Sequence, residues 1–363
     1  FIRAAGVSGW AEIPATREVG VLRFHVPADL VPADGFSYWL RLRARDGSEV
    51  DYPPGGASSP IRVVTTTGLP EVAMPALRWD DRARPAATVL RLPPGRGAGE
   101  VGFSGDGGLE GPSSFDVAPD GSIVVADWAN GRLQRFAPDG RYADEAPLPV
   151  RRPVDLAVAP GDRLFMTTLG TDAQAFEVAA DGKVLGRYPV GYGVASRVAA
   201  GAVPRVRVGA SQWIPVREAP GVPLSADAQG RAETASVPLA DGSVGLTADL
   251  PGGFAAVWTR PDGSRAGAVV RLPKGVLLGA DYFARPLPDG GALVARGVWD
   301  ETHFGIALLR LTAAGRVASF SLLPEPSHRI VAPYSTIRFL GPRAVLLATD
   351  DGEALRIQRF GVR

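Results

Sequence analysis

The sequence predicts an all-β protein in which a small β-sandwich precedes a closed ring of repeated antiparallel sheets. Apolar residues come in short runs that Gly and Pro interrupt, as in strands joined by tight turns. Gly (45 residues) and Pro (33 residues) are abundant but follow no collagen-like period. Asp-Gly, often as Pro-Asp-Gly, recurs between the apolar runs, and Gly readily takes the positive φ that a tight hairpin turn needs.

Composition excludes several classes of protein. A chain of 363 residues is too long for one typical core and favours two domains or a repeat. The net charge of +1 indicates no broad basic surface for nucleic acid, and no apolar run reaches the roughly eighteen residues of a membrane span. Because Cys is absent, disulfides, thiolate nucleophiles and Cys-ligated zinc are excluded. Abundant Ala, Gly, Pro and Arg with only two lysines are typical of a GC-rich bacterial genome.

The N-terminal region, residues 1–68, contains three strand-like segments. FSYWLRLRAR (36–45) alternates apolar and basic residues after its first positions, which predicts a half-buried strand. VLRFHV (21–26) alternates in the same way, and IRVVTTT (61–67) is rich in β-branched residues. The turn-rich DGSEVDYPPGGASSP (46–60) separates the segments 36–45 and 61–67, so we expect an antiparallel β structure here.

Residues 20–68 resemble the second half of a fibronectin type III domain. The resemblance rests on Leu30-Val31-Pro32, then Tyr38-x-Leu40-Arg41-Leu42-x-Ala44, then Ser59-Pro60 and a Thr-rich last strand. Such a sandwich has about seven strands in roughly 100 residues, so the first strands are expected to be missing. Either the region begins within a domain, or another chain adds strands to an exposed edge and forms an oligomer or filament. Residues 69–85 carry three Pro and no clear periodicity, which predicts an inter-domain linker.

From residue 86 to 363 the sequence repeats a four-strand pattern. Residues 112–149 and 153–190 each hold four strand-sized pieces, and their starts lie 41 residues apart. This period fits one antiparallel blade of a β-propeller. The third unit (191–240) is long and Pro-rich, and the fourth (243–273) holds only three strands around its PGG and PDG turns.

Counting the fourth-strand endings gives the number of blades. Five endings follow the repeats: EAPLPV (145–150), GRYPV (186–190), ASVPL (235–239), AVVRLP (268–273) and ASFSLLP (318–324). A sixth copy, ATVLRLP (87–93), stands before the first repeat, whereas the C-terminal stretch 334–363 offers three strands without a fourth. We therefore expect a six-bladed propeller in which the N-terminal strand closes the last blade, so that the ring has no free sheet edge.

The stretch from 98 to 140 resembles an NHL-repeat propeller. It carries GFSGDGG (102–108), a Pro before the first strand, Asp-Gly between the first two strands, and the link Ala126-Asp127-Trp128-Ala129-Asn130-Gly131-Arg132. The resemblance implies a propeller but not one activity, because the family includes protein-binding modules, surface proteins and a few enzymes. Its lyases use several His around a zinc ion, whereas this chain has only His25, His303 and His328.

The first candidate site is the link with Asp127, Trp128 and Asn130. One interpretation is that Asp127 and Asn130 satisfy backbone groups of a tight turn. The other is that they form, with Arg132, a polar binding group. Asp106 in the neighbouring GFSGDGG has a similar pair of interpretations, as an ion-binding nest or as part of a Gly-rich crossover.

The second candidate site is WDETHF (299–304). Asp300, Glu301 and His303 could ligate a metal such as calcium or act as acid and base, or the segment is a solvated loop tip. The repeat places it between strands two and three, on the face that carries Asp127, Asn130, Asp172 and Asp350-Asp351. Trp299 and Trp128 would then be exposed anchors for a partner, or wedges between blades.

Two functions remain open on these observations. The first is a non-catalytic, extracellular or cell-surface binding and assembly protein whose propeller face contacts a protein or a glycan. The second is a secreted propeller enzyme, a lyase or lactone hydrolase, with a divalent cation in the central channel. No catalytic set is recognisable, since the nucleophile motif GxSxG is absent. The chain begins at Phe1 without a leader pattern, so we expect a processed protein or a piece of a longer one.

Overall fold

A computed structural model describes the chain except residues 5–6, 19–20, 33–34, 45, 53–55, 59, 64, 66–67, 104–110, 169–172, 191–194, 200–203, 209–211, 217–243, 260–263, 331–332 and 363. The described part is almost entirely β structure, with 3-10 turns of three or four residues as its helices. None of the described helices is long and apolar enough to cross a membrane.

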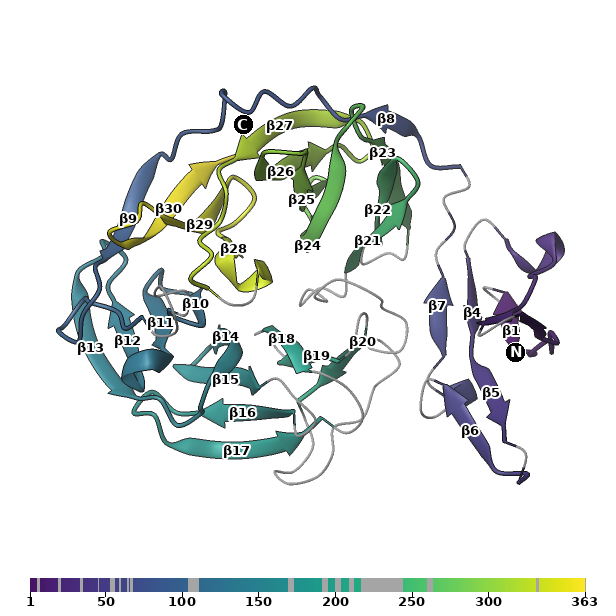
Figure 1. Ribbon diagram of the computed structural model, residues 1–363, viewed down its shortest axis with the longest axis horizontal. Coiled ribbons are helices and arrows are strands. Elements are labelled where there is room, and N and C mark those ends of the chain that lie inside the picture. Colours follow the sequence, from purple (N-terminus) through teal and green to yellow (C-terminus); the bar gives the residue numbers. More distant parts are fainter. Residues whose placement is uncertain are drawn as a thin grey trace.

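Most strands belong to antiparallel sheets arranged in a ring, as in a β-propeller (Figure 1). Two of the described sheets are each built from four consecutive strands. The first consists of β10 (Ser114–Val117), β11 (Ile123–Asp127), β12 (Arg132–Phe136) and β13 (Tyr142–Pro147). The second consists of β14 (Pro153–Ala159), β15 (Arg163–Thr168), β16 (Gln174–Val178) and β17 (Val184–Pro189). A third sheet has three described strands: β18 (Ala195–Ala199), β19 (Arg205–Val208) and β20 (Gln212–Pro215). The two repeats that the sequence predicts best are therefore confirmed as four-stranded sheets.

Three further sheets of the ring, as far as the structure describes it, come from the C-terminal half of the chain. One consists entirely of consecutive strands: β24 (Leu277–Pro286), β25 (Ala292–Trp299), β26 (Phe304–Leu311) and β27 (Val317–Leu323). The remaining two each have three consecutive strands: β21 (Val244–Leu250), β22 (Gly253–Thr259) and β23 (Arg265–Arg271), and β28 (Ile337–Phe339), β29 (Ala344–Asp350) and β30 (Leu355–Gly361). Each takes its fourth strand from a segment that comes before the first full sheet in the chain: β8 joins the first of these sheets and β9 joins the second.

The predicted closing strand is confirmed. β9 (Ala87–Leu92) pairs antiparallel with β30, and Leu92 lies opposite Leu355. Figure 1 shows β9 beside β30, at the point where the two ends of the ring meet. The pairing buries Leu90 and Leu92 against Phe115 and Ile357, so the closing strand also fills the core between the last sheet and the first.

The prediction for residues 69–85 was wrong in part. This segment contains β8 (Glu71–Ala73), which pairs parallel with β23 as the outer strand of its sheet. AVVRLP (268–273), predicted as a fourth strand, therefore belongs to the third strand, β23. The predicted fourth strand ASVPL (235–239) lies outside the described residues. The sequence did not predict this strand, because it has only three residues and a parallel strand is not joined to its neighbour by a hairpin turn.

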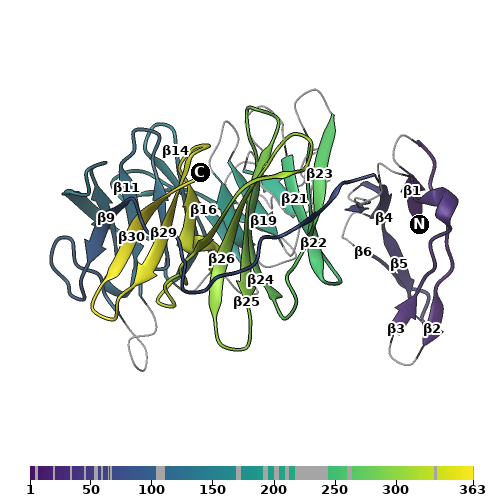
Figure 2. The same cartoon turned by 90° about the horizontal axis from the view of Figure 1, so that it is seen from above.

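The segment between β8 and β9 runs along the outer edge of the β24–β27 sheet (Figure 2). Met74 N–H donates to Arg271 O at 2.8 Å, Ala83 N–H donates to Leu322 O at 2.8 Å, and Ala86 N–H donates to Arg359 O at 2.7 Å. We call residues 74–86 the strap. Together with β8 and β9, the strap connects three neighbouring sheets of the ring.

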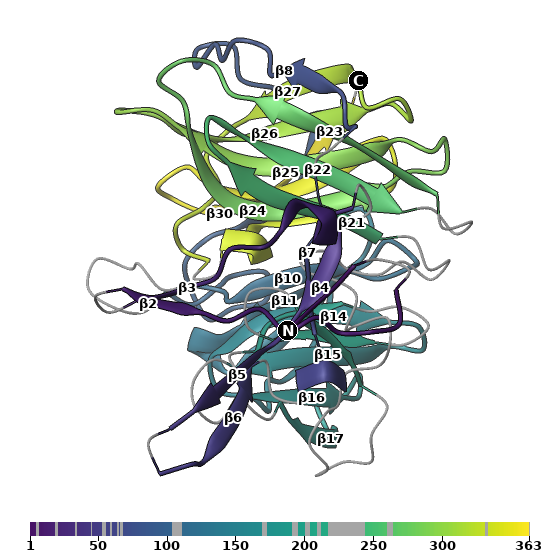
Figure 3. The same cartoon turned by 90° about the vertical axis from the view of Figure 1, so that its right-hand side faces the viewer.

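The N-terminal region forms small sheets beside the ring in Figure 1 and lies in front of it in Figure 3. A three-stranded sheet contains β1 (Ile2–Ala4), β4 (Phe36–Tyr38) and β7 (Ile61–Val63), and two hairpins are formed by β2 (Thr16–Glu18) with β3 (Val21–Arg23) and by β5 (Leu40–Arg43) with β6 (Glu49–Tyr52). The single strand predicted over 36–45 is interrupted at Trp39. The Trp39 ring is 5% exposed and stacks on Phe1 with centroids 4.2 Å apart, so this aromatic contact marks the change from β4 to β5.

Candidate functional site

The two predicted loops lie where the repeat places them. The link at 128–131 joins β11 to β12, and the loop at 300–303 joins β25 to β26. Both connect the second strand of a sheet to the third, and the sheets repeat this order around the ring. Asp350 ends β29 and Asp351 follows it, in the corresponding position of the last sheet, and they pair with Arg329 and Arg356 respectively. Asp172 and Asp106 lie outside the described residues.

The Asp127 carboxylate is completely buried and accepts several hydrogen bonds. Its Oδ1 accepts the Gly102 N–H at 2.9 Å. Its Oδ2 accepts from Asn130 Nδ2 at 2.9 Å, from Arg132 Nε at 3.0 Å and from Gln134 Nε2 at 3.2 Å. A buried carboxylate needs this many hydrogen-bond donors, because its transfer out of water otherwise costs much free energy. These contacts agree with the interpretation that Asp127 has a structural role, in which its carboxylate holds the link between β11 and β12 in place.

The donors around Asp127 also hold the loop that follows the closing strand. Asn130 Nδ2 donates to Gly95 O at 2.8 Å, and Arg132 Nη2 donates to Gly97 O at 2.8 Å and to Glu100 O at 3.0 Å. Gln134 both donates to Glu100 O and accepts from Gly99 N–H. We call Asp127, Asn130, Arg132 and Gln134 the loop clamp. It holds residues 95–102, which belong to the connection from β9 to the first full sheet.

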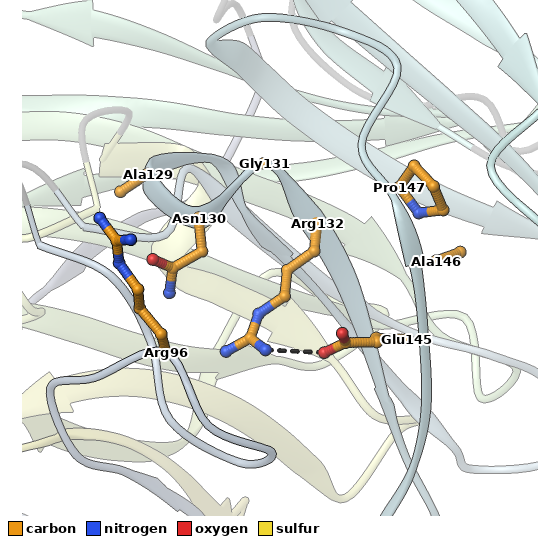
Figure 4. A pocket seen from close by; sticks show the side chains of 8 residues that line it. All are labelled: Arg96, Ala129, Asn130, Gly131, Arg132, Glu145, Ala146 and Pro147. Carbon is orange, nitrogen blue, oxygen red and sulfur yellow. Dashed lines mark hydrogen bonds and ion pairs between the residues drawn. The ribbon is translucent and has the colours of Figure 1, made fainter.

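A pocket of about 560 Å³ opens beside the loop clamp (Figure 4). Asn130, Arg132 and Glu145 line it, with Arg96 across the opening (Figure 4). Arg132 Nη1 donates to Glu145 Oε2 at 2.7 Å, and the Glu145 side chain is 45% exposed. The exposed Arg96 has no ion-pair partner within the described part of the chain. The pocket therefore offers a free guanidinium and a partly used carboxylate to a polar ligand.

Trp128 is half-buried, so it is neither a fully exposed anchor nor a deep wedge. The Arg152 guanidinium lies over its ring, 4.9 Å from the centroid. Arg152 belongs to the connection between the first and second full sheets, where its φ is +50°. Trp128 thus packs against the neighbouring connection with one ring face.

The loop at 299–304 is closed by its own aspartate. Asp300 Oδ1 accepts the N–H groups of Thr302 at 2.9 Å and His303 at 2.8 Å. The Thr302 and His303 N–H groups, with the His303 ring, lower the pKa of the Asp300 carboxyl from 3.8 to about 2, because they stabilise its charged form. Asp300 Oδ1 and His303 Nδ1 are 3.2 Å apart. The local hydrogen bonds explain Asp300 as the cap of a tight turn.

The outer side of this loop carries aromatic groups. Trp299 is 40% exposed and donates from Nε1 to Leu278 O at 3.0 Å. The His303 ring stacks on Trp79 of the strap, with centroids 5.3 Å apart and planes 14° apart. Glu301 is exposed at the loop tip. Within the described residues, no three His, Asp or Glu side chains gather in an arrangement that could hold a metal ion.

A second polar centre lies in the central channel and was not predicted. Asp155 on β14 is 1% exposed, and its Oδ1 accepts from Ser114 Oγ at 3.1 Å, from Ser335 Oγ at 2.9 Å and from Arg338 Nη2 at 2.6 Å. Its Oδ2 accepts the Val198 N–H at 3.0 Å. One carboxylate thus connects the innermost parts of four sheets.

A pocket of about 240 Å³ lies in the channel between the innermost strands. Its lining includes three arginines and one half-buried carboxylate: Arg197, Arg285, Arg338 and Asp116. Burial lowers the pKa of the Arg197 guanidinium to about 10 and raises the pKa of the Asp116 carboxyl, which Arg338 partly offsets. Arg197 Nη1 donates to Tyr282 O at 2.6 Å. The excess of guanidinium groups favours an anionic group in this pocket over a cation.

The sequence contains a signal for the channel residues. When the repeats at 112 and 153 are aligned on their first Pro, Ser114 and Asp155 take the same position. Each belongs to an innermost strand, β10 or β14, that is otherwise largely apolar. A polar residue at this repeated inward position indicates a contact across the channel, whereas the residues predicted as sites all lie in or beside loops.

Comparisons with known proteins give no family. No family model and no curated protein matches the sequence, so the NHL-repeat and fibronectin type III resemblances rest on the residues alone. Similar solved structures include Kuenenia stuttgartiensis hydrazine synthase, with 15% identity over 66% of this chain and 77% of that chain and a TM-score of 0.41. Others are virginiamycin B lyase from Staphylococcus aureus (12% identity, 90% and 88% covered, TM-score 0.37) and the WD40 repeats of RRP9 (11%, 78% and 99%, TM-score 0.43). At these scores the likeness assigns no activity to this chain.

Proposed function

We propose that this chain is a non-catalytic binding and assembly protein of the cell surface or the extracellular space. In this proposal a six-bladed propeller of the NHL-repeat type presents its loop face to a protein or glycan partner, and the N-terminal region is a fibronectin type III-like module at 1–68 that adds a second contact. The chain would come from a bacterium with a GC-rich genome.

One observation carries this proposal: three aspartates of the candidate sites and the channel serve as acceptors for the chain's own donors. Asp127 and Asp155 each accept four hydrogen bonds, and Asp300 closes its own turn. A general base needs a free acceptor within reach of a substrate proton. These three aspartates are instead placed to hold the fold, which supports a rigid binding surface.

The side chains that remain accessible on the loop face are suited to binding a partner. The pocket beside the loop clamp presents Arg96 and Glu145, and Trp299 exposes 40% of its surface. Exposed aromatic and arginine side chains are the residue types that carry most binding energy at interfaces. A partner that contacts this face would bury Trp299 and pair with Arg96.

The experiment is a binding screen against immobilised glycans and peptides with matched variants. Arg96→Glu and Trp299→Ala should each weaken a bound probe at least about tenfold, because each removes a main contact. Leu185→Ala is the control, since Leu185 is 46% exposed on the outer strand β17. A probe that binds all four proteins equally would contradict the loop face as the binding surface.

The alternative is a secreted lyase or lactone hydrolase that acts in the central channel. It is favoured by the channel pocket, where charged groups with shifted pKa values meet in a concave site. The arginines there suit an anionic or carbonyl substrate better than the calcium or other divalent cation that this alternative invokes. Metal analysis of the purified protein, followed by melting with and without calcium, separates the two. Stoichiometric metal that raises Tm would favour the enzyme.

A further inference from the structure

The channel pocket lies near the carboxyl ends of the innermost strands. Its lining includes Asp116 and Val117 at the end of β10, Arg285 near the end of β24 and Phe339 at the end of β28. Each of these strands turns there into the second strand of its sheet, which runs antiparallel back toward the loop face. The pocket therefore lies toward the opposite face of the ring, which we call the turn face.

The hydrogen bonds of Asp155 lie between this pocket and the loop face. Ser114, Ser335 and Arg338 all donate to Asp155 Oδ1. Ser114 begins β10, and Asp155 directly precedes the lining residues 156–158 of β14. Both residues are thus nearer to the loop face than the lining residues of the same strands. A ligand would therefore enter the pocket from the turn face.

Positive charge exceeds negative charge in the lining of the pocket, as far as the structure describes it. Three guanidinium groups line it, those of Arg197, Arg285 and Arg338, with the single carboxylate of Asp116. The carboxylate of Asp155 borders them. Both carboxylates lie against the same guanidinium, because Arg338 is 3.3 Å from Asp116 Oδ1 and 2.6 Å from Asp155 Oδ1. An anion in the pocket would offset the remaining positive charge.

Arg197 carries its charge in a buried position, with 9% of its surface exposed. Its Nη1 donates to the Tyr282 backbone carbonyl, which accepts a hydrogen bond but does not neutralise the charge. Burial lowers the pKa of the guanidinium to about 10, against the opposing charge of Asp155. Asp281 opposes the lowering too, but it lies 3.4 Å from Arg296. A bound anion would stabilise the charged form and offset the cost of burial.

The rest of the pocket lining is apolar and partly aromatic. Val117 and Val198 contribute aliphatic surface. Phe283 and Phe339 pack edge to face, with ring centroids 6.3 Å apart. The guanidinium carbon of Arg285 lies 3.9 Å from the centroid of the Phe339 ring, so positive charge and aromatic surface adjoin. This lining suits a ligand with an apolar body and one anionic group better than a small hydrated ion, which would lose its water to apolar walls.

The volume of the pocket limits the size of that ligand. An apolar cavity of about 150 Å³ holds one benzene molecule. The channel pocket, at about 240 Å³, has room for one such ring with a carboxylate attached. It is smaller than the pockets of about 300–1,000 Å³ that take drug-sized ligands, so a nucleotide or a folded peptide segment does not fit.

We propose that the channel pocket binds a small carboxylate that carries one flat apolar ring. The carboxylate faces the guanidinium groups of Arg197 and Arg285, and the ring lies against Phe283 and Phe339. This inference goes beyond the proposed loop-face function and does not rest on it, because the pocket opens on the turn face and uses none of the loop residues.

The experiment measures binding of small molecules to the full chain by isothermal titration calorimetry. Benzoate is the probe, because it combines one ring with one carboxylate. Benzamide keeps the shape without the charge, benzamidine reverses the charge, and acetate and inorganic phosphate are anions without a ring. Benzoate should bind at least about tenfold more tightly than each of the four, because it alone combines charge-assisted hydrogen bonds to guanidinium groups with a buried ring.

Variants of Arg285 connect the binding to the pocket without breaking the hydrogen bonds that Arg338 makes to Asp155. Arg285→Gln should weaken benzoate about tenfold and leave benzamide unchanged, because it removes only charge from the lining. Arg285→Glu reverses the charge and should prefer benzamidine to benzoate. Arg359→Gln is the matched control, since Arg359 is exposed on β30 outside the pocket, and it should bind benzoate as the native chain does. Circular dichroism and Tm confirm that the variants are folded.

Several outcomes would overturn the proposal. Equal binding of benzoate and benzamide, or no saturable binding of benzoate at millimolar concentration, would show that the arginines do not select a carboxylate. Tighter binding of phosphate or acetate would assign the pocket to an anion without a ring. Unchanged binding of benzoate to Arg285→Glu would place the probe elsewhere. Arg96→Glu and Trp299→Ala should leave benzoate binding unchanged, so this proposal and the loop-face proposal can fail separately.

Discussion

Two loops of the ring carry an aspartate beside a tryptophan, yet they use the pair differently. Asp127 is fully buried and gathers donors from its own link, from β12 and from the loop at 95–102. Asp300 is bound only by the N–H groups and side chains of its own turn. The first aspartate connects distant parts of the chain, whereas the second accepts hydrogen bonds from Thr302 and His303 of its own turn. Similar residue types at the same place in the repeat therefore have different consequences for stability.

The cause of the difference is the neighbouring segment. The first full sheet receives the chain directly from the closing strand β9, and this connection passes over the link at 127–132. The loop at 299–304 meets the strap instead, through the Trp79 ring and an Arg82 Nη2 bond to Phe304 O at 3.2 Å. A buried carboxylate is useful where a loop must be held, and an exposed one where only a turn must close.

Among the substitutions that test this difference, replacing Asp127 should lower the free energy of unfolding most. Asp127→Ala leaves Arg132 with 11% of its side chain exposed and without its buried partner, so the free energy of unfolding should fall by about 3–5 kcal/mol. Urea unfolding followed by tryptophan fluorescence measures this. Asp127→Asn is the matched control, because it keeps the volume but places an amide among donors, and it should lie between alanine and the native protein. A loss below about 1 kcal/mol for alanine would refute a structural role.

Asn130→Ala should have the next largest effect. The change removes the donor to Gly95 O and to Asp127 Oδ2, which should cost about 1–2 kcal/mol. Amide hydrogen exchange should become faster in residues 95–102 and stay unchanged at 299–304. If exchange rises equally in both loops, the clamp does not act locally.

His303→Ala tests the contact of the second loop with the strap. Loss of the stack on Trp79 should lower the free energy of unfolding by about 0.5–1 kcal/mol. Exchange of the Ala83 N–H, which bonds to Leu322 O, should become faster. His303→Phe keeps a ring at this position and should restore slow exchange; failure to do so would mean that the ring contact does not hold the strap.

Asp300→Asn should have the smallest effect, visible only as a change in pH dependence. The pKa of Asp300 falls from 3.8 to about 2 in the folded chain, so its carboxylate stabilises the fold above about pH 4 and loses this contribution as pH falls toward 2. Tm measured between pH 5 and pH 2 should fall less steeply for the variant than for the native protein. Parallel curves would show that the turn does not depend on the charge.

The sequence predicts most of the ring because its repeats are local. Alternating runs separated by Asp-Gly turns locate β10 to β17, and the unmatched ATVLRLP locates β9 as the partner of β30. The sequence does not reveal β8, because it has only three residues and pairs parallel with a strand far away in the chain. The break at Trp39 was also missed, since alternation of apolar and polar residues does not report an aromatic stack with Phe1.

The candidate sites were predicted by residue type more than by contact. Asp127 and Asn130 stand out in the sequence, and one of their two interpretations matches their hydrogen bonds. Asp155 was missed, because a single aspartate in an apolar strand has no motif around it and its match to Ser114 is visible only when the two repeats are aligned. Its role depends on Ser114, Ser335 and Arg338, which only the closed ring brings together.

The strap and its two flanking strands determine when the ring can be completed. β8 and β9 leave the ribosome well before their partners β23 and β30 are made. During synthesis both strands must wait with unpaired edges, a state that invites association with other chains. The ring should therefore close only after β30 has been made, and chaperones that shield the unpaired β8 and β9 should assist folding.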